Sequence, residues 1–354
     1  MNKNNMISFW RVIFAFSIAL HHLYNAYSIP TFWMISVEFF FIVSGWLLAA
    51  KAETSDISNF RYIAHRIKRL APHYITALVV CVICMRFGYI WNVKNQLSID
   101  SIWTWFTIYG YKEVLLIHFW PWGTDWWNIA NVPTWYISVM LVCGLILYSL
   151  YKNHRSMLCQ IIIPISIVTF YGVSYKLFRN FTEDEYIYEI FSLKLFRGFT
   201  EMGIGILLYE FNKKHATFPK KTCIRDAIGF MCLALVLVFS YSYGEQYNYI
   251  YVVLITIGVI CSFNSEIRYG KRIVNKLSNL SYSIYLNHNV IRWYVMPRIF
   301  KEISIWNILL YLIIVVVFAF IMDLLTKGII RLYKRSKTLI NFDNKSNMQS
   351  IKQR

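Results

Sequence analysis

The run MISFWRVIFAFSIALHHLYNAY, residues 6–27, decides the fold, because it is long enough and apolar enough to cross a bilayer. It lacks a small-residue cleavage site, and Arg11 interrupts it, so we expect a retained helix and not a cleaved signal peptide. Arg11 and His22 are the unusual residues of this run, since a simple membrane anchor has no need of either.

Apolar runs of about 20 residues recur along the rest of the chain, and we count about ten of them. Hydrophobic residues make up 57% of the 354 and charged residues 15%, which is too apolar for an ordinary soluble domain. The sequence therefore predicts an all-α, polytopic membrane protein. The expected helix centres are Phe16, Phe41, Val82, Leu141, Ile167, Thr200, Leu235, Thr256, Asn287 and Val315.

Lysine and arginine gather in alternate loops, and positively charged loops stay on the cytoplasmic side. Both termini are therefore predicted to be cytoplasmic, with a transmembrane domain over residues 1–336 and a short basic tail over 337–354. The formal net charge of +18 follows from this topology, and we expect no nucleic-acid binding. The seven cysteines are scattered among apolar runs, so we expect small apolar fillers and no metal site.

One non-cytoplasmic stretch, residues 91–132, is long and too polar in places to span, and we expect an interfacial or re-entrant helix within it. Eight of the thirteen tryptophans lie in or beside this stretch. They fit an aromatic belt at the lipid headgroups. They also fit a vestibule for a carbohydrate, because aromatic faces stack on sugar rings. Both interpretations stay open.

Ionisable residues within spans are costly, so each one indicates a possible site. Arg11 and His22 are eleven residues apart, which returns them to nearly one helix face about 16 Å apart along the axis. Snorkelling of Arg11 to headgroups and a structural role for His22 are the plain alternatives. Glu38 enters the second span at about the depth of His22, so a hydrogen bond between them is geometrically possible. His21 is turned away by about 100° and is expected to pack.

Two further arginine patterns are informative. Arg66 and Arg69 stand at i and i+3 at the cytoplasmic mouth of the third span, an arrangement that suits phosphate groups or anionic lipid. Arg197 and Glu201 stand at i and i+4 in the sixth span and are expected to neutralise each other. His288, in the ninth span, falls at a depth similar to that of His22 and is either a second polar wall or structural.

The run from Arg11 to His22 resembles the signature of the acyltransferase 3 family, an arginine and a histidine separated by ten residues. Further segments resemble the family's other motifs in the same order. These are Val37-Glu-Phe-Phe-Phe-Ile-Val-Ser-Gly45, Arg66-Ile-Lys-Arg69-Leu-Ala-Pro72, Thr134-Trp-Tyr136 and Leu280-Ser-Tyr-Ser-Ile-Tyr-Leu-Asn-His288. Each string is degenerate, but five in order within a ten-helix layout are fairly specific.

The resemblance implies transfer of an acyl group, most often acetyl, from cytosolic acyl-CoA to a hydroxyl of an extracytoplasmic polysaccharide or lipid-linked glycan. It also implies a multi-pass protein of a bacterial-type cell membrane, in contact with membrane lipids. Arg66 and Arg69 would bind the phosphates of acetyl-CoA, and Arg11 the pantetheine arm. His22, supported by Glu38, would act at the thioester as general base or transient acyl carrier.

Trp135, Tyr282, Tyr285 and His288 would then bind the acceptor glycan. A transporter of a glycolipid or small molecule is the leading alternative, because it too would place charged residues along a transmembrane path. The absence of matched Gly/Pro interruptions in paired helices favours the enzyme. A purely structural scaffold would not need Arg11, His22 and Glu38 inside the membrane.

Overall fold

The computed structural model describes residues 5–90, 103, 106–117, 129–181, 186–187, 191–215, 223–263, 265, 270–299 and 302–352. The protein is almost entirely helical over these residues, which confirms the predicted all-α fold class. The long helices are α1 (Asn5–Ala26), α2 (Ser36–Thr54), α3 (Asn59–Ile90), α6 (Trp135–Asn153), α8 (Ile163–Phe178), α9 (Leu193–Lys214), α10 (Cys223–Ser242), α11 (Asn248–Phe263), α12 (Lys271–Val290) and α14 (Ile305–Lys352).

Short elements connect the long helices. The α-helical ones are α5 (Tyr111–Val114), α7 (Arg155–Met157) and α13 (Met296–Ile299). Single 3-10 turns occur at η1 (Trp33–Ile35), η4 (Val132–Thr134) and η6 (Gly244–Tyr247), and π-helical turns at η2 (Phe106–Gly110), η5 (Leu158–Ile162) and η7 (Ile291–Val295). Strands β1 (Tyr186–Ile187) and β2 (Phe191–Ser192) form a small antiparallel ladder.

All ten helix centres predicted from the apolar runs lie in ten different long helices. Eight helical segments among the described residues are long and apolar enough to span a membrane. The other two, α9 and α12, are more polar, because their polar side chains face the interior of the bundle. Lys194, Arg197 and Glu201 of α9 are buried, as are Asn287 and His288 of α12. That α9 and α12 also cross the membrane stays a prediction.

Helices α2 and α9 pack with their backbones in direct contact. A Cβ atom added at Gly45 of α2 would lie 1.8 Å from the backbone oxygen of Met202, and one added at Gly205 of α9 would lie 1.9 Å from that of Ile42. Such an approach is possible only where both helices present glycine, the small-residue packing common in membrane bundles. The close contact fixes α9 against α2 in the core.

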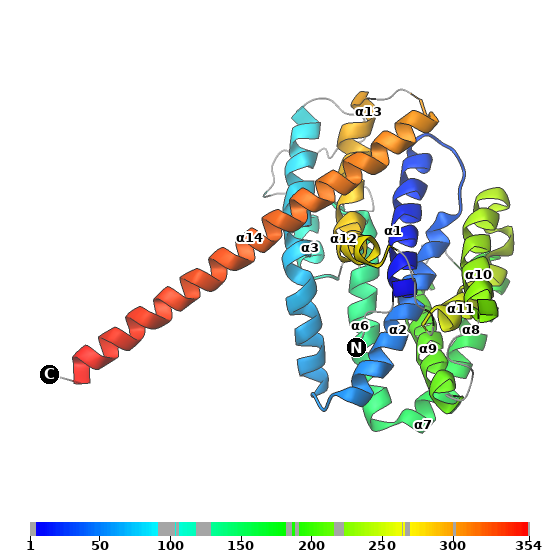
Figure 1. Ribbon diagram of the computed structural model, residues 1–354, viewed down its shortest axis with the longest axis horizontal. Helices are drawn as coiled ribbons and strands as arrows, with labels where there is room; N and C mark the ends of the chain where they lie inside the picture. The colour runs from blue at the N-terminus through cyan, green and yellow to red at the C-terminus, as the bar shows by residue number, and fades with distance from the viewer. Residues whose placement is uncertain are drawn as a thin grey trace.

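Helix α1 packs against α12, and α14 packs across α12 and α3. Figure 1 shows α14, in orange and red, running obliquely past α12 and α3, with its C-terminal part extending away from the other helices. The helix is continuous to Lys352, so no break in secondary structure marks the expected start of the tail at residue 337. The predicted division into a domain and a tail therefore stays a prediction.

The long stretch at residues 91–132 is described only in part, as η2, α5 and the residues from 129 onward. Of the eight tryptophans in or beside it, the structure describes two. Trp103 is 73% exposed and Trp135 is buried. The choice between an aromatic belt and a sugar vestibule depends on tryptophans outside the described residues.

Candidate active site

Arg11 and His22 both face α12, as their spacing on α1 predicts. The Arg11 guanidinium lies 3.5 Å from the hydroxyl of Ser281. Two turns further along α12, the fully buried ring of His288 stacks on the half-buried ring of His22, with centroids 5.2 Å apart and planes 23° apart. The contact between α1 and α12 thus has a cation at one end and a histidine pair at the other.

The structure does not pair Glu38 with His22, although their similar depths made a hydrogen bond between them possible. Both carboxylate oxygens of Glu38 accept from Arg197, at 3.1 Å from Nε and in a shorter contact from Nη2. The planar guanidinium fork suits a carboxylate, and two charges so deeply buried need each other's compensation. Because α2 packs closely against α9, Glu38 forms its ion pair with Arg197 and stabilises the contact between these two helices.

The α9 charges form a wider network than the expected pairing of Arg197 with Glu201. Glu201 interacts electrostatically with both Arg197 and Glu38, and one of its oxygens accepts a hydrogen bond from the hydroxyl of Tyr171 at 3.2 Å. Lys194 lies over the ring of Trp135, 5.2 Å from its centroid. Trp135, expected to bind substrate, therefore packs against the cations of α9.

Arg11, Arg66, Arg69, Tyr136 and Tyr282 form one group, here called the arginine–tyrosine cluster. The charges of Arg11 and Arg69 act on each other, although they lie on different helices. Tyr136 interacts electrostatically with Arg11 and Arg66, and Tyr282 with Arg69. The three arginines predicted to bind the acyl donor are thus brought into one neighbourhood.

The arginines of this cluster have few polar partners of their own. Arg66 contacts the sulfur of Met140 at 3.3 Å and lies over the ring of Tyr62. Arg69 is exposed, whereas Arg11 and Arg66 are half-buried. No carboxylate of a described residue forms an ion pair with any of the three. Like charges held together repel, so the cluster is suited to binding an anion.

The tyrosines expected to bind substrate also hold the helices together. Tyr285 donates a hydrogen bond to the carbonyl of Pro133, and its ring lies edge-on to Tyr136, with centroids 6.0 Å apart. Tyr282 donates to the carbonyl of Leu70, next to the kink-prone Pro72 inside α3. Both hydroxyls are therefore engaged with backbone in this structure.

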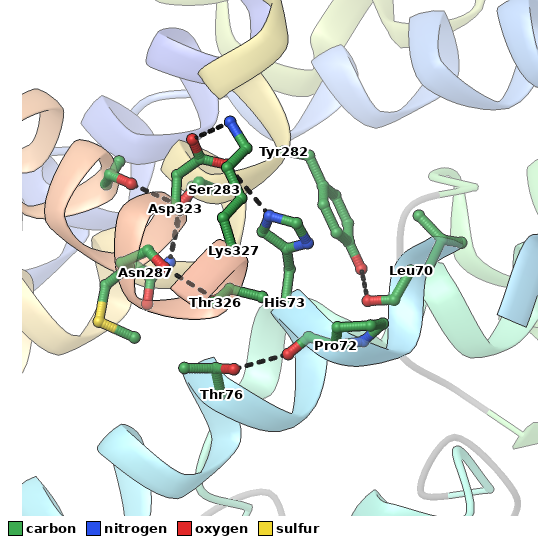
Figure 2. Close-up of polar contacts among 12 residues, drawn as sticks. Leu70, Pro72, His73, Thr76, Tyr282, Ser283, Asn287, Asp323, Thr326 and Lys327 are labelled. Atoms are coloured by element: carbon green, nitrogen blue, oxygen red, sulfur yellow. Dashed lines mark hydrogen bonds and ion pairs between the residues drawn. The ribbon is translucent and has the colours of Figure 1, made fainter. Parts of the chain in front are cut away.

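Figure 2 shows a polar junction between α3, α12 and α14 that the sequence analysis did not identify. His73 of α3 lies 3.1 Å from Asp323 of α14, which also receives Lys327 at 2.5 Å. The other neighbour of His73 is Tyr282, whose ring is 6.1 Å away and edge-on. Because His73 is one turn after Arg69, this junction supports the part of α3 that presents the arginines.

Arg292 is a second residue missed by the sequence analysis. It lies in the π-helical turn η7, four residues after His288, and its charge acts on His21, His22 and His288. Its Nε is buried without a hydrogen-bond partner among the described residues, and the guanidinium lies over the ring of Trp293. The sequence feature that could have identified Arg292 is a cation one helical turn after His288, where the last matched motif ends.

Glu113 of α5 was also missed, because it lies outside the apolar runs. Its carboxylate accepts hydrogen bonds from the backbone N–H groups of Ala130 at 2.7 Å and Asn131 at 3.0 Å. The side-chain amide of Asn131 in turn donates to the carbonyl of Leu286 on α12. Burial raises the pKa of Glu113 to about 7, although the two N–H groups oppose the shift. Glu113 therefore anchors the turn that leads into Trp135 and Tyr136.

The helical bundle with several apolar spans, and its buried histidines and buried Arg197, define a multi-pass membrane protein with an internal polar site. Residues 4–324 match the profile of the acyltransferase 3 family, Acyl_transf_3, which is described as an acyltransferase domain. The chain belongs to this family and is a membrane acyltransferase. No curated protein and no solved structure matches it.

Proposed function

We propose that this acyltransferase transfers an acetyl group from cytosolic acetyl-CoA to a hydroxyl of an extracytoplasmic polysaccharide or lipid-linked glycan. The observation that carries the proposal is the arginine–tyrosine cluster, in which Arg11, Arg66 and Arg69 meet without an acidic partner among the described residues. Coenzyme A has several phosphate groups, and guanidinium groups bind phosphate by charge-assisted hydrogen bonds.

The roles proposed for the site residues follow their positions. Arg66 and Arg69 bind the phosphates, and Arg11 guides the pantetheine arm along α1 towards His22. Ser281 lies beside Arg11, and His288, two turns further along α12, lies beside His22. The acyl donor and the two histidines would therefore lie along the same contact between α1 and α12. Glu38 is left out of the chemistry, since it binds Arg197.

The protein would work in a cell membrane of bacterial type, with membrane lipids around it and the glycan acceptor on the outer side. A transporter of a glycolipid is the other candidate, because an anionic headgroup would also suit the three arginines. The enzyme is favoured by the family and by the paired imidazoles, since a neutral imidazole is a good proton acceptor near neutral pH.

The test is mass spectrometry of ester-linked acyl groups on surface glycans of cells that express the protein. We expect the wild type to add an ester, and His22→Ala to lower its amount by about 100-fold or more, on the scale that loss of a side chain acting in the chemical step has. Arg69→Ala should also lower it, whereas Arg61→Ala, an exposed arginine on the same helix, should not.

A wild type that adds no ester to any glycan would overturn the proposal, as would full activity of His22→Ala. A transporter would change the amount of glycan or glycolipid at the surface without adding an ester. Protein levels in the membrane should be matched by immunoblotting, so that a loss of ester is not a loss of protein.

A further inference from the structure

The His288 ring is held in one protonation pattern by its own helix. Its Nδ1 lies 2.7 Å from the carbonyl oxygen of Tyr285, three residues earlier. A carbonyl can only accept a hydrogen bond, so Nδ1 carries the hydrogen. A neutral imidazole has one ring hydrogen, and Nε2 is therefore left with a free lone pair.

That lone pair has no hydrogen-bond donor in the described part of the chain. Nε2 of His288 is buried and unpartnered, and the residue is 0% exposed. A buried acceptor without a donor costs free energy, and such groups in native proteins call for an explanation. The missing partner must be a donor, such as a hydroxyl group, because Nε2 has no hydrogen to give.

The surroundings of Nε2 suit an acyl-transfer step. The half-buried His22 ring stacks on His288 at 5.2 Å, and the charge of Arg292 acts on both rings. A fixed positive charge stabilises the negative oxygen that forms when a nucleophile attacks a thioester. An oriented proton acceptor on α12, a second imidazole on α1 and a cation on η7 thus lie close together.

We propose that Nε2 of His288 is the general base that takes the proton of the acceptor hydroxyl, while His22 contacts the thioester. This inference rests on the proposed function. The hydroxyl oxygen forms a bond to the thioester carbon, and the bond from that carbon to sulfur breaks. The proton taken by His288 passes to the departing thiolate, so the products are the ester and free coenzyme A.

The test compares two nucleophiles that accept acetyl from acetyl-CoA, using the purified full-length protein. One is the envelope glycan that the wild type acylates, whose hydroxyl must lose its proton during attack. The other is hydroxylamine, a strong nucleophile that attacks thioesters without help from a base. The product of the first is a glycan ester, and that of the second is acetohydroxamate, counted only as the amount formed above that in a reaction without the protein.

We expect His288→Gln to lower glycan ester formation by about 100-fold or more, the scale of general-base catalysis, and to retain most acetohydroxamate formation. His22→Ala should lose both products, because it is proposed to contact the thioester. His21→Gln is the matched control and should keep both, since His21 packs beside His22 with its Nδ1 bonded to Thr31.

Equal loss of both products in a folded His288→Gln protein would show a structural role and overturn the assignment, as would full retention of both. A wild type that forms neither product would overturn the proposed acyl donor. This result differs from failure of the His288 assignment, in which the wild type forms both products.

If His288→Gln does not fold, the wild type still gives a test. Ester formation should fall at acid pH more steeply than acetohydroxamate formation does, after correction for the concentration of neutral hydroxylamine. Equal pH dependence of the two products would contradict the proposal.

Discussion

Glu38 of α2 and Arg197 of α9 form an ion pair from which solvent is almost wholly excluded, with exposed side-chain fractions of 0% and 1%. The same two helices touch backbone to backbone at Gly45 and Gly205. A carboxylate that the sequence places at about the depth of His22 therefore belongs to the packing of two helices, and the chemistry proposed above uses residues of α1, α3 and α12 instead.

Replacing Arg197 by methionine should destabilise the protein strongly, because Glu38 would remain buried without its partner. We expect the free energy of unfolding to fall by about 3–5 kcal/mol, the usual effect of breaking a buried pair. Thermal unfolding of purified protein in detergent measures the change. The double variant Glu38→Leu/Arg197→Met should recover much of the loss, and a single variant as stable as the wild type would contradict the packing role.

Replacing Gly45 by alanine should separate α2 from α9, since the new methyl group would overlap the backbone oxygen of Met202. Overpacking of this kind costs typically about 1–3 kcal/mol, and more where backbone must move. The measurement is the yield of folded protein on size-exclusion chromatography. Gly172→Ala on α8 is the control, because a methyl group there meets no atom within 4 Å, and its yield should be unchanged.

Protonation of Glu113 should make the protein more stable at mildly acid pH than at alkaline pH. The pKa of this carboxyl is about 7 in the folded protein, above its ordinary value of 4.5, so the folded state binds the proton more tightly. Stability is then fully present below about pH 4.5 and is lost as the pH rises through about 7, by at most about 3 kcal/mol.

Melting temperature recorded against pH tests this assignment. The wild type should lose stability between about pH 4.5 and pH 7, on top of whatever other groups contribute. In Glu113→Gln this component should be absent, because glutamine does not titrate. If the melting temperatures of the two proteins change equally with pH between about pH 4.5 and pH 7, Glu113 is not the source of the loss of stability.

Removing Arg69 should weaken donor binding more than it slows the chemical step. A hydrogen bond to a charged group is worth about 1.5–3 kcal/mol, so Arg69→Ala should raise KM for acetyl-CoA by about 10-fold to 100-fold. Steady-state kinetics with varied acetyl-CoA measures KM and kcat separately. A fall in kcat at unchanged KM would place Arg69 away from the phosphates.

The apolar runs were sufficient to locate the ten long helices, eight of which include a segment that is long and apolar enough to span a bilayer. Helical phase was sufficient to turn Arg11 and His22 towards one partner, since both lie on a single regular helix. The partner itself, α12, could not be predicted in this way. Periodicity within one helix says nothing about which other helix covers that face.

The same limit explains the errors. Glu38 and His22 were paired because they have similar depths. The close approach of α2 and α9 at Gly45 and Gly205 instead places Arg197 next to Glu38. Arg292 was overlooked because it follows the last matched motif, in a π-helical turn that shifts the helical phase. Glu113 lies in a short helix between spans, where hydropathy gives no guidance.

The length of α14 has a practical consequence for anyone who attaches a reporter to this protein. Its 48 residues extend about 72 Å, more than twice the hydrocarbon thickness of a bilayer of about 30 Å. A fluorophore joined after Lys352 would lie at the end of α14 that extends away from the other helices, far from the histidine pair. Such a fluorophore would therefore respond to the tilt of α14 and not to events at the histidine pair.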